Sequence, residues 1–304
     1  MLVLVALVAW PVGLLVWANG RLQHTPALSG AADTPGTTYL LAGSDARGDD
    51  GGIAEDGTEG HRTDTILLLH VPASGPTALI SLPRDTYVEV PGQGGAKLNS
   101  AFAWGGAPLL VQTVEGLTGL TVDHYAEIGM GGVAHLVDAV GGVNLCYDGD
   151  VDDSDSGMVW SAGCHDVDGG AALAFARMRK SDPLGDVGRA LRQRQLIGAV
   201  MGKVSPGALA LDPGAQVSLV RAGTGALTFD EDAGVLDVAR LALAFRAANG
   251  DGGITGTPPI ASMDHRPGGV GSTVLLDPDQ AAGFFAAIRD GSLPPGPVGG
   301  VPGG

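Results

Sequence analysis

Short apolar runs, each closed by glycine, proline or charged residues, constrain the fold of this chain most. Three lie early in the sequence, at 39–42, 65–71 and 78–82, and two more follow at 124–128 and 142–145. Runs of this length with such boundaries are typical of buried strands. Segments with helical periodicity alternate with them, at 108–117, 131–140, 232–248 and 277–290. Strands mixed with helices predict a layered α/β domain.

Acidic and basic residues stand together where the first three predicted strands begin or end, in segments 43–47, 61–65 and 82–86. In open α/β sheets the functional crevice lies beyond strand ends, so these segments predict one site. Asp45 and Asp64 suit a hard cation such as Mg²⁺, which takes one or two carboxylates and leaves its other positions to water and substrate phosphate. Each triplet taken alone is equally typical of a turn with a local ion pair.

The segment 176–195 concentrates basic side chains in a chain whose formal net charge is -16. Arg177 and Arg179 alternate as at the end of a strand or in an extended loop, whereas Arg189, Arg192 and Gln193 have helical i, i+3, i+4 spacing. Guanidinium groups suit phosphate because each donates two parallel hydrogen bonds and keeps its charge. The alternative is a solvated helix face paired with nearby acids.

Clustering favours the phosphate interpretation. Ten of the 17 Lys and Arg residues lie in these few motifs: Arg47, Arg62, Arg84, Lys97, Arg177, Arg179, Lys180, Arg189, Arg192 and Arg194. The acidic overall charge and an aromatic content of 5% argue against nucleic acid as a partner. The chain also lacks a Gly-x-Ser-x-Gly elbow, a Walker loop and a His-Glu-x-x-His motif. A phosphorylated small molecule or lipid head group is the expected ligand.

The N-terminal residues 1–18 carry no charged side chain and are long enough to cross a bilayer of roughly 30 Å. We predict a transmembrane anchor at 1–20, with a cleaved signal peptide as the alternative. A polar linker at 21–37 and one folded domain at 38–290 would follow. The Pro- and Gly-rich end, 291–304, is predicted to be a flexible tail.

Cys146 and Cys164 are the only cysteines, and they flank an acidic loop at 148–157. A disulfide between them would staple that loop and favour an extracytoplasmic body. Two free buried cysteines are the alternative.

The ordered motifs resemble the LytR-CpsA-Psr family of cell-envelope phosphotransferases over about residues 38–204. The resemblance rests on the segments 43–47, 62–65, 82–86, 97–102, 123–125, 137–143 and 177–193. It implies a membrane-anchored, extracytoplasmic, three-layer α/β/α domain with a mixed central sheet. Departures occur at Gly129, where the family often has an acid, and at Arg194, where it often has glutamine.

The resemblance also assigns residues by position. Asp45 and Asp64 match the magnesium ligands of the family. Its pyrophosphate-binding set matches Arg47, Arg62, Arg84, Lys97, Arg177, Arg179, Arg189 and Gln193.

The implied activity is transfer of a polyprenyl-pyrophosphate-linked glycopolymer, of teichoic-acid, arabinogalactan or capsule type, onto peptidoglycan. Arg84 and Asp85 are the candidate catalytic residues; Asp85 could act as the base or could orient Arg84, whose charge would weaken it as a base. Two other functions need the same phosphate contacts: a non-catalytic lipid-pyrophosphate binder that regulates envelope assembly, and a polyprenyl pyrophosphatase.

Overall fold

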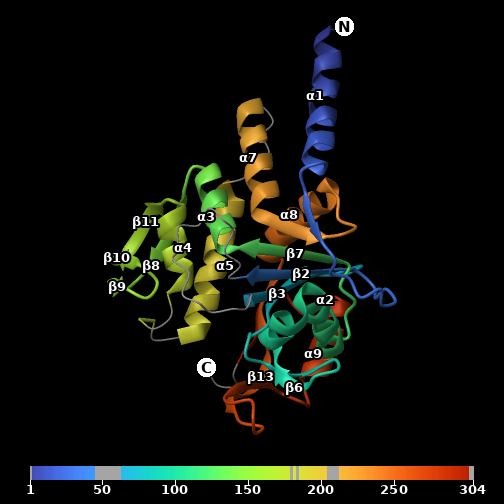
Figure 1. Ribbon diagram of the computed structural model, residues 1–304, viewed down its shortest axis with the longest axis vertical. Helices are drawn as coiled ribbons and strands as arrows, with labels where there is room; N and C mark the ends of the chain where they lie inside the picture. The colour runs from blue at the N-terminus through green and yellow to red at the C-terminus, as the bar shows by residue number, and fades with distance from the viewer. Residues whose placement is uncertain (1, 45–62, 179–180, 183–184, 204–211, 301–304) are drawn as a thin grey trace. The chain divides into compact units, whose positions relative to one another are not determined.

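The structure, a computed structural model, describes residues 2–44, 63–178, 181–182, 185–203 and 212–300 (Figure 1). These residues divide into two compact units. The described residues of the first fall within 1–23 and 129–227, and those of the second within 24–46, 52–128 and 228–304. The chain therefore forms two units where the sequence predicts a single domain at 38–290.

The second unit is built on a nine-stranded sheet. The strand order is β1 (Gln23–Thr25), β12 (Leu227–Asp230), β7 (His124–Gly129), β2 (Thr37–Ser44), β3 (Thr63–Val71), β4 (Ala78–Ser81), β13 (Ile254–His265) and β14 (Thr273–Leu276), with β15 (Gly296–Gly300) beside β13. Strands β2, β3 and β4 pair antiparallel, whereas β13 is parallel to β4 and β15. The mixed central sheet is confirmed.

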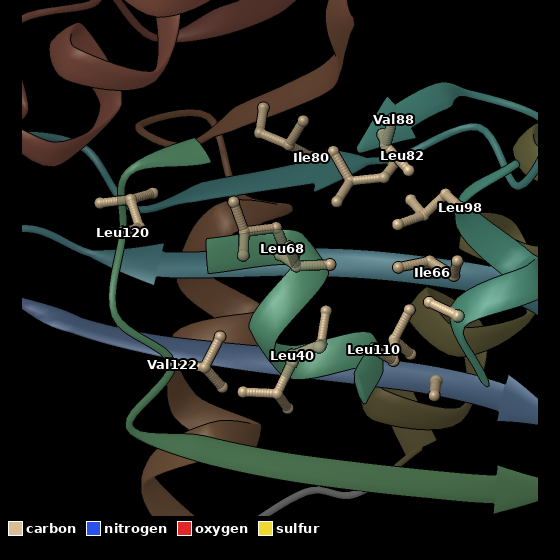
Figure 2. Packing of buried hydrophobic residues seen from close by; sticks show 14 of the residues in the cluster. Leu40, Ile66, Leu68, Ile80, Leu82, Val88, Leu98, Leu110, Leu120 and Val122 are labelled. Atoms are coloured by element: carbon tan, nitrogen blue, oxygen red, sulfur yellow. The ribbon is translucent and has the colours of Figure 1, made fainter. Parts of the chain in front are cut away.

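Helices cover both faces of this sheet. On one face Leu68 packs with the other labelled residues of Figure 2, among them Leu110 of α2 (Leu98–Thr118), in a core that also includes residues of α9 (Ala281–Arg289). Leu67 and Leu69 are buried as well, and alternate side chains of a strand point to opposite faces. Helix α8 (Val235–Ala248) contacts β3 and β4. The apolar run of β3 is continuous because the strand is buried on both faces.

Two segments predicted as linker and tail belong to the sheet instead. Strand β1 lies within 21–37, and just beyond it Ala27 is buried and donates its N–H to Glu231 Oε2 at 2.9 Å. Strand β15 lies within 291–304 and pairs with β13. Neither strand could be predicted from amino-acid composition, because the hydrogen bonds between strands use backbone groups and need no apolar side chains.

The first unit begins with α1 (Leu2–Asn19), which covers most of the predicted anchor at 1–20. No helix in the described residues combines the length and apolar character needed to cross a membrane. The remaining elements are α3 (Met130–Ala139), β8 (Val143–Tyr147), β9 (Val151–Asp153), β10 (Met158–Trp160), β11 (Gly163–Val167), α4 (Gly169–Arg177), α5 (Gly185–Lys203) and α7 (Pro213–Ala226).

Cys146 and Cys164 lie directly opposite each other on the antiparallel strands β8 and β11, and the structure joins them in a disulfide. The predicted pairing is confirmed. The bond ties together the two strands that flank the β9–β10 hairpin, and therefore staples the acidic loop.

Candidate functional site

Four charged side chains of the second unit form one chain of ion pairs. Arg84 donates from Nη1 to Oδ1 of Asp64, and its Nε lies 3.6 Å from Oδ2 of Asp85. Lys97 donates from Nζ to the other oxygen of Asp85, Oδ1, at 2.9 Å. All four are site residues predicted from the sequence, and the structure brings them together.

Short connections between strands hold these residues in place. Asp64 is the second residue of β3, Arg84 and Asp85 form the turn after β4, and Lys97 ends β6 (Gly94–Lys97), the second strand of a hairpin with β5 (Tyr87–Val90). The turn is closed by Thr86, whose N–H and hydroxyl both donate to the carbonyl of Pro83, at 3.0 and 2.6 Å.

The start of α2 is fastened to this same turn. The N–H groups of Leu98 and Asn99 donate to the carbonyls of Thr86 and Arg84, at 2.9 and 3.0 Å. Two donors at the helix N-terminus, which have no partner within the helix, are satisfied in this way. The backbone around Arg84, Asp85 and Lys97 is therefore positioned before any ligand binds.

The group is neither buried nor fully solvated. Side-chain exposure is 19% for Arg84, 25% for Asp85, 28% for Lys97 and 32% for Asp64. Two carboxylates alternate with two cations, so each cation is oriented by a carboxylate yet stays within reach of solvent. Such an arrangement can bind an anion such as a phosphate, because charge-assisted hydrogen bonds from Arg and Lys are strong when the donors are already oriented.

Of the two predicted magnesium ligands, Asp64 is in this group and Asp45 lies outside the described residues. Ser44, directly before Asp45, has a buried hydroxyl without a hydrogen-bond partner in the described part of the chain. A carboxylate and a hydroxyl oxygen are donors that fit Mg²⁺. Among the described residues, no three Asp, Glu, His or Cys side chains gather as a metal site.

The basic run belongs to the first unit. Helix α5 confirms the helical spacing of Arg189, Arg192 and Gln193. The prediction of a strand end or extended loop at Arg177 is wrong, since Arg177 is the last residue of α4. Three further members of the predicted set, Arg47, Arg62 and Arg179, lie outside the described residues.

Arg192 has a structural role that its spacing does not reveal. Its side chain is 4% exposed and forms an ion pair with the equally buried Asp182. It also donates to the carbonyl of Phe175 at 3.0 Å and to that of Met178, and its guanidinium lies 5.8 Å from the ring centroid of Tyr147. Arg192 therefore holds the end of α4 against α5 and β8.

A second polar cluster in the sheet unit was not predicted from sequence. His124 Nδ1 lies 3.4 Å from Oδ2 of the fully buried Asp230, and Nε2 lies 3.9 Å from Oδ1 of Asp237. The ring stacks on Tyr39 at a centroid distance of 5.2 Å. The hydrogen bond to Asp230 is the main cause of a raised pKa of His124. This histidine fastens β7 to β12 and α8.

Comparison with known proteins places these features in a family. The LytR_cpsA_psr family matches residues 18–210. The probable cell wall biosynthesis protein LcpB of Corynebacterium glutamicum is 44% identical over 284 residues, which cover 90% of this chain and 66% of LcpB. The polyisoprenyl-teichoic acid–peptidoglycan teichoic acid transferase TagU of Enterococcus faecalis is 42% identical over 169 residues, 55% of this chain and 53% of TagU.

This chain thus spans between about half and two-thirds of the length of these relatives. Among solved structures, the LytR-Csp2A-Psr enzyme of Actinomyces oris aligns with a TM-score of 0.70 at 22% identity, covering 88% of this chain and 96% of that one. That likeness concerns the fold. From the match to residues 18–210, the chain belongs to the LytR_cpsA_psr family.

Proposed function

We propose that this chain acts in the cell envelope and transfers a glycopolymer from a polyprenyl-pyrophosphate carrier to peptidoglycan. The observation that carries the proposal is the oriented chain Asp64–Arg84–Asp85–Lys97, which presents two cations to an anionic group. The names of the relatives support the substrate classes, because LcpB is a cell wall biosynthesis protein and TagU a teichoic acid–peptidoglycan transferase.

The chemistry is a displacement at phosphorus. A hydroxyl oxygen of the peptidoglycan acceptor bonds to the phosphorus that carries the glycan and gives up its proton to water, while the bond from that phosphorus to the oxygen that bridges the two phosphorus atoms breaks. Polyprenyl phosphate leaves with the bonding electrons. Negative charge grows on the leaving phosphate, and Arg84 and Lys97 would stabilise it through donors that need no reorganisation.

Asp85 lies between these two cations, so in this proposal it orients them. Asp45 and Asp64 would hold Mg²⁺, which when bound supplies further positive charge to the pyrophosphate oxygens. The family resemblance extends donor binding to Arg47, Arg62, Arg177, Arg179, Arg189 and Gln193, and the proposal includes these residues.

A synthetic glycan-linked polyprenyl pyrophosphate tests the proposal, incubated with and without a peptidoglycan acceptor. We expect polyprenyl phosphate and glycan-modified peptidoglycan only when acceptor is present. Release of polyprenyl phosphate and glycan phosphate without acceptor would identify a pyrophosphatase instead, and tight binding without any turnover would identify a non-catalytic binder.

Magnesium is tested separately by titrating Mg²⁺ into the wild-type protein and Asp64→Asn in a calorimeter, with inorganic pyrophosphate present. We expect the variant to bind Mg²⁺ more weakly and chelation to stop transfer by the wild type. Transfer at the normal rate in EDTA would contradict the magnesium assignment.

A further inference from the structure

Trp104 is a large aromatic side chain that α2 leaves in solvent. It is 53% exposed, whereas Trp160 in the core of the first unit is 7% exposed. Its neighbours on both sides, Ala103 and Gly105, are small and exposed too. About half of the Trp104 surface is therefore open to solvent.

A glycine-encoded break in the helix fixes this position. Gly105 and Gly106 depart from helical geometry, with φ and ψ of −140° and 15° at Gly105 and 61° and −153° at Gly106. The second pair of angles lies in a region that is essentially restricted to glycine. A Cβ at Gly105 would lie 2.6 Å from Cβ of Leu109, so glycine is also needed for packing. Trp104 is therefore the last residue of a short first segment of α2.

The same segment starts at the charged group. Lys97 directly precedes α2 as its N-cap, and within the helix Ser100 and Trp104 are four residues apart, so these two side chains share one face of the first segment. The distance along the axis from Lys97 to Trp104 is roughly 10 Å. Helical side chains lean toward the N-terminus of their helix, which carries the ring of Trp104 toward Lys97.

We propose that Trp104 stacks on a pyranose ring of the glycan next to the reacting phosphate. The inference rests on the proposed function, in which both the donor glycan and the acceptor glycan carry a sugar bonded to the reacting centre. A pyranose presents a C–H face to an aromatic ring and hydroxyls to the indole N–H, and indole combines an apolar face with one polar donor.

The surroundings favour a sugar over a prenyl tail. A prenyl chain needs a continuous apolar surface, and among the described residues none of the other exposed large apolar side chains lies on α2. Ser100, between Trp104 and Lys97, instead offers a hydroxyl that a sugar can use.

Calorimetric titrations of the whole chain test this assignment with two neutral glycans: an N-acetylglucosamine tetramer, which resembles the acceptor, and the donor glycan released from its carrier. We expect Trp104→Ala to weaken binding of one of them by about tenfold or more, and Trp104→Phe to keep part of it. Trp10→Ala is the matched control, because Trp10 is 45% exposed but lies on α1. The glycan whose binding is weakened shows whether the pyranose that stacks on Trp104 belongs to the donor or to the acceptor.

Inorganic pyrophosphate separates this inference from the proposed function. Trp104→Ala should bind it like the wild type, whereas Arg84→Lys should bind it more weakly and keep its glycan affinity. Equal glycan affinity of Trp104→Ala and the wild type would overturn the assignment. So would a loss confined to farnesyl pyrophosphate, because the ring would then contact the prenyl chain. If Arg84→Lys bound pyrophosphate as tightly as the wild type, that result would count against the proposed function but not against the role of Trp104.

Discussion

The ammonium of Lys97 lies 2.9 Å from Oδ1 of Asp85, whose other oxygen faces Arg84. One carboxylate thus orients two cations that come from different connections of the sheet unit. Because all three side chains are partly exposed, the pairs should contribute little to the free energy of unfolding, about 1 kcal/mol or less. Their expected contribution is to the placement of positive charge.

Asp85→Asn keeps the shape of the side chain and removes its charge. We expect it to lower kcat/KM for the lipid-pyrophosphate donor by about tenfold or more, because the two cations lose their fixed orientation. The double variant Asp85→Asn, Lys97→Met should lose less kcat/KM than the sum of the two single-variant losses in free energy, since both changes disrupt the same ion pair. The rates of the four proteins of this double-mutant cycle measure the coupling, and strictly additive effects would show that Asp85 and Lys97 act independently.

Arg84→Lys retains the positive charge but not the planar fork that donates two parallel hydrogen bonds. We expect the affinity for inorganic pyrophosphate to fall by about 1.5 to 3 kcal/mol, roughly tenfold or more. Arg266→Lys is the matched control: Arg266 also pairs with an aspartate, Asp264, at 3.0 Å, but is 70% exposed. Equal affinities in the two variants would mean that Arg84 does not contact the anion.

Arg192→Leu should act on stability instead. Removing one partner of a buried ion pair leaves the other charge unpaired, here Asp182, at a cost of about 3 to 5 kcal/mol. Urea unfolding measures this cost. Lys203→Leu, at the exposed end of the same helix, is the control and should change the free energy of unfolding by less than about 0.5 kcal/mol. A similar stability for both variants would contradict the role of Arg192.

Arg192 also shows that the sequence predicts a helix better than it predicts which face of that helix is buried. Helical spacing correctly placed Arg189, Arg192 and Gln193 on one helix, but spacing alone does not tell a buried face from an exposed one. The partner of His124, Asp230, is 106 residues away, so no local pattern could reveal that pair. By contrast Asp64, Arg84 and Asp85 were predictable, because their charges interrupt apolar runs where strands begin or end.

The strands were predictable for the same reason. Strands β2, β3 and β4 carry apolar runs that bury both faces, whereas β1 and β15 are short and lack such runs, although they pair with the sheet. Helix α2 starts at Leu98, whereas helical periodicity in the sequence is clear only over 108–117, since the break at Gly105 and Gly106 interrupts the pattern.

Reduction of the Cys146–Cys164 disulfide should destabilise the first unit by about 3 kcal/mol, because the bond limits the freedom of the unfolded chain. Urea unfolding with and without reductant measures the difference. The double variant Cys146→Ser, Cys164→Ser should match the reduced wild type and should not respond to reductant. A response of the double variant would show that the reductant acts elsewhere.

His124 predicts a pH dependence of stability. Its pKa is raised in the folded state, chiefly by the hydrogen bond to Asp230, with further attraction from Asp237 and Asp123. The folded chain therefore holds this proton more tightly than the unfolded chain, whose histidine has a pKa of about 6.5. The added stability is fully present below that value and is lost as pH rises through the raised folded pKa.

His124→Gln keeps hydrogen-bonding capacity without the charge, so the difference in free energy of unfolding between wild type and variant should be largest below the unfolded pKa of about 6.5 and should shrink as the pH rises through the raised folded pKa. His70 acts in the opposite direction, since burial lowers its pKa, and subtracting the variant from the wild type cancels its contribution. Denaturant unfolding from below about pH 6.5 into the alkaline range measures the difference at each pH. A difference that stayed constant with pH would show that His124 contributes through packing on Tyr39 and not through its proton.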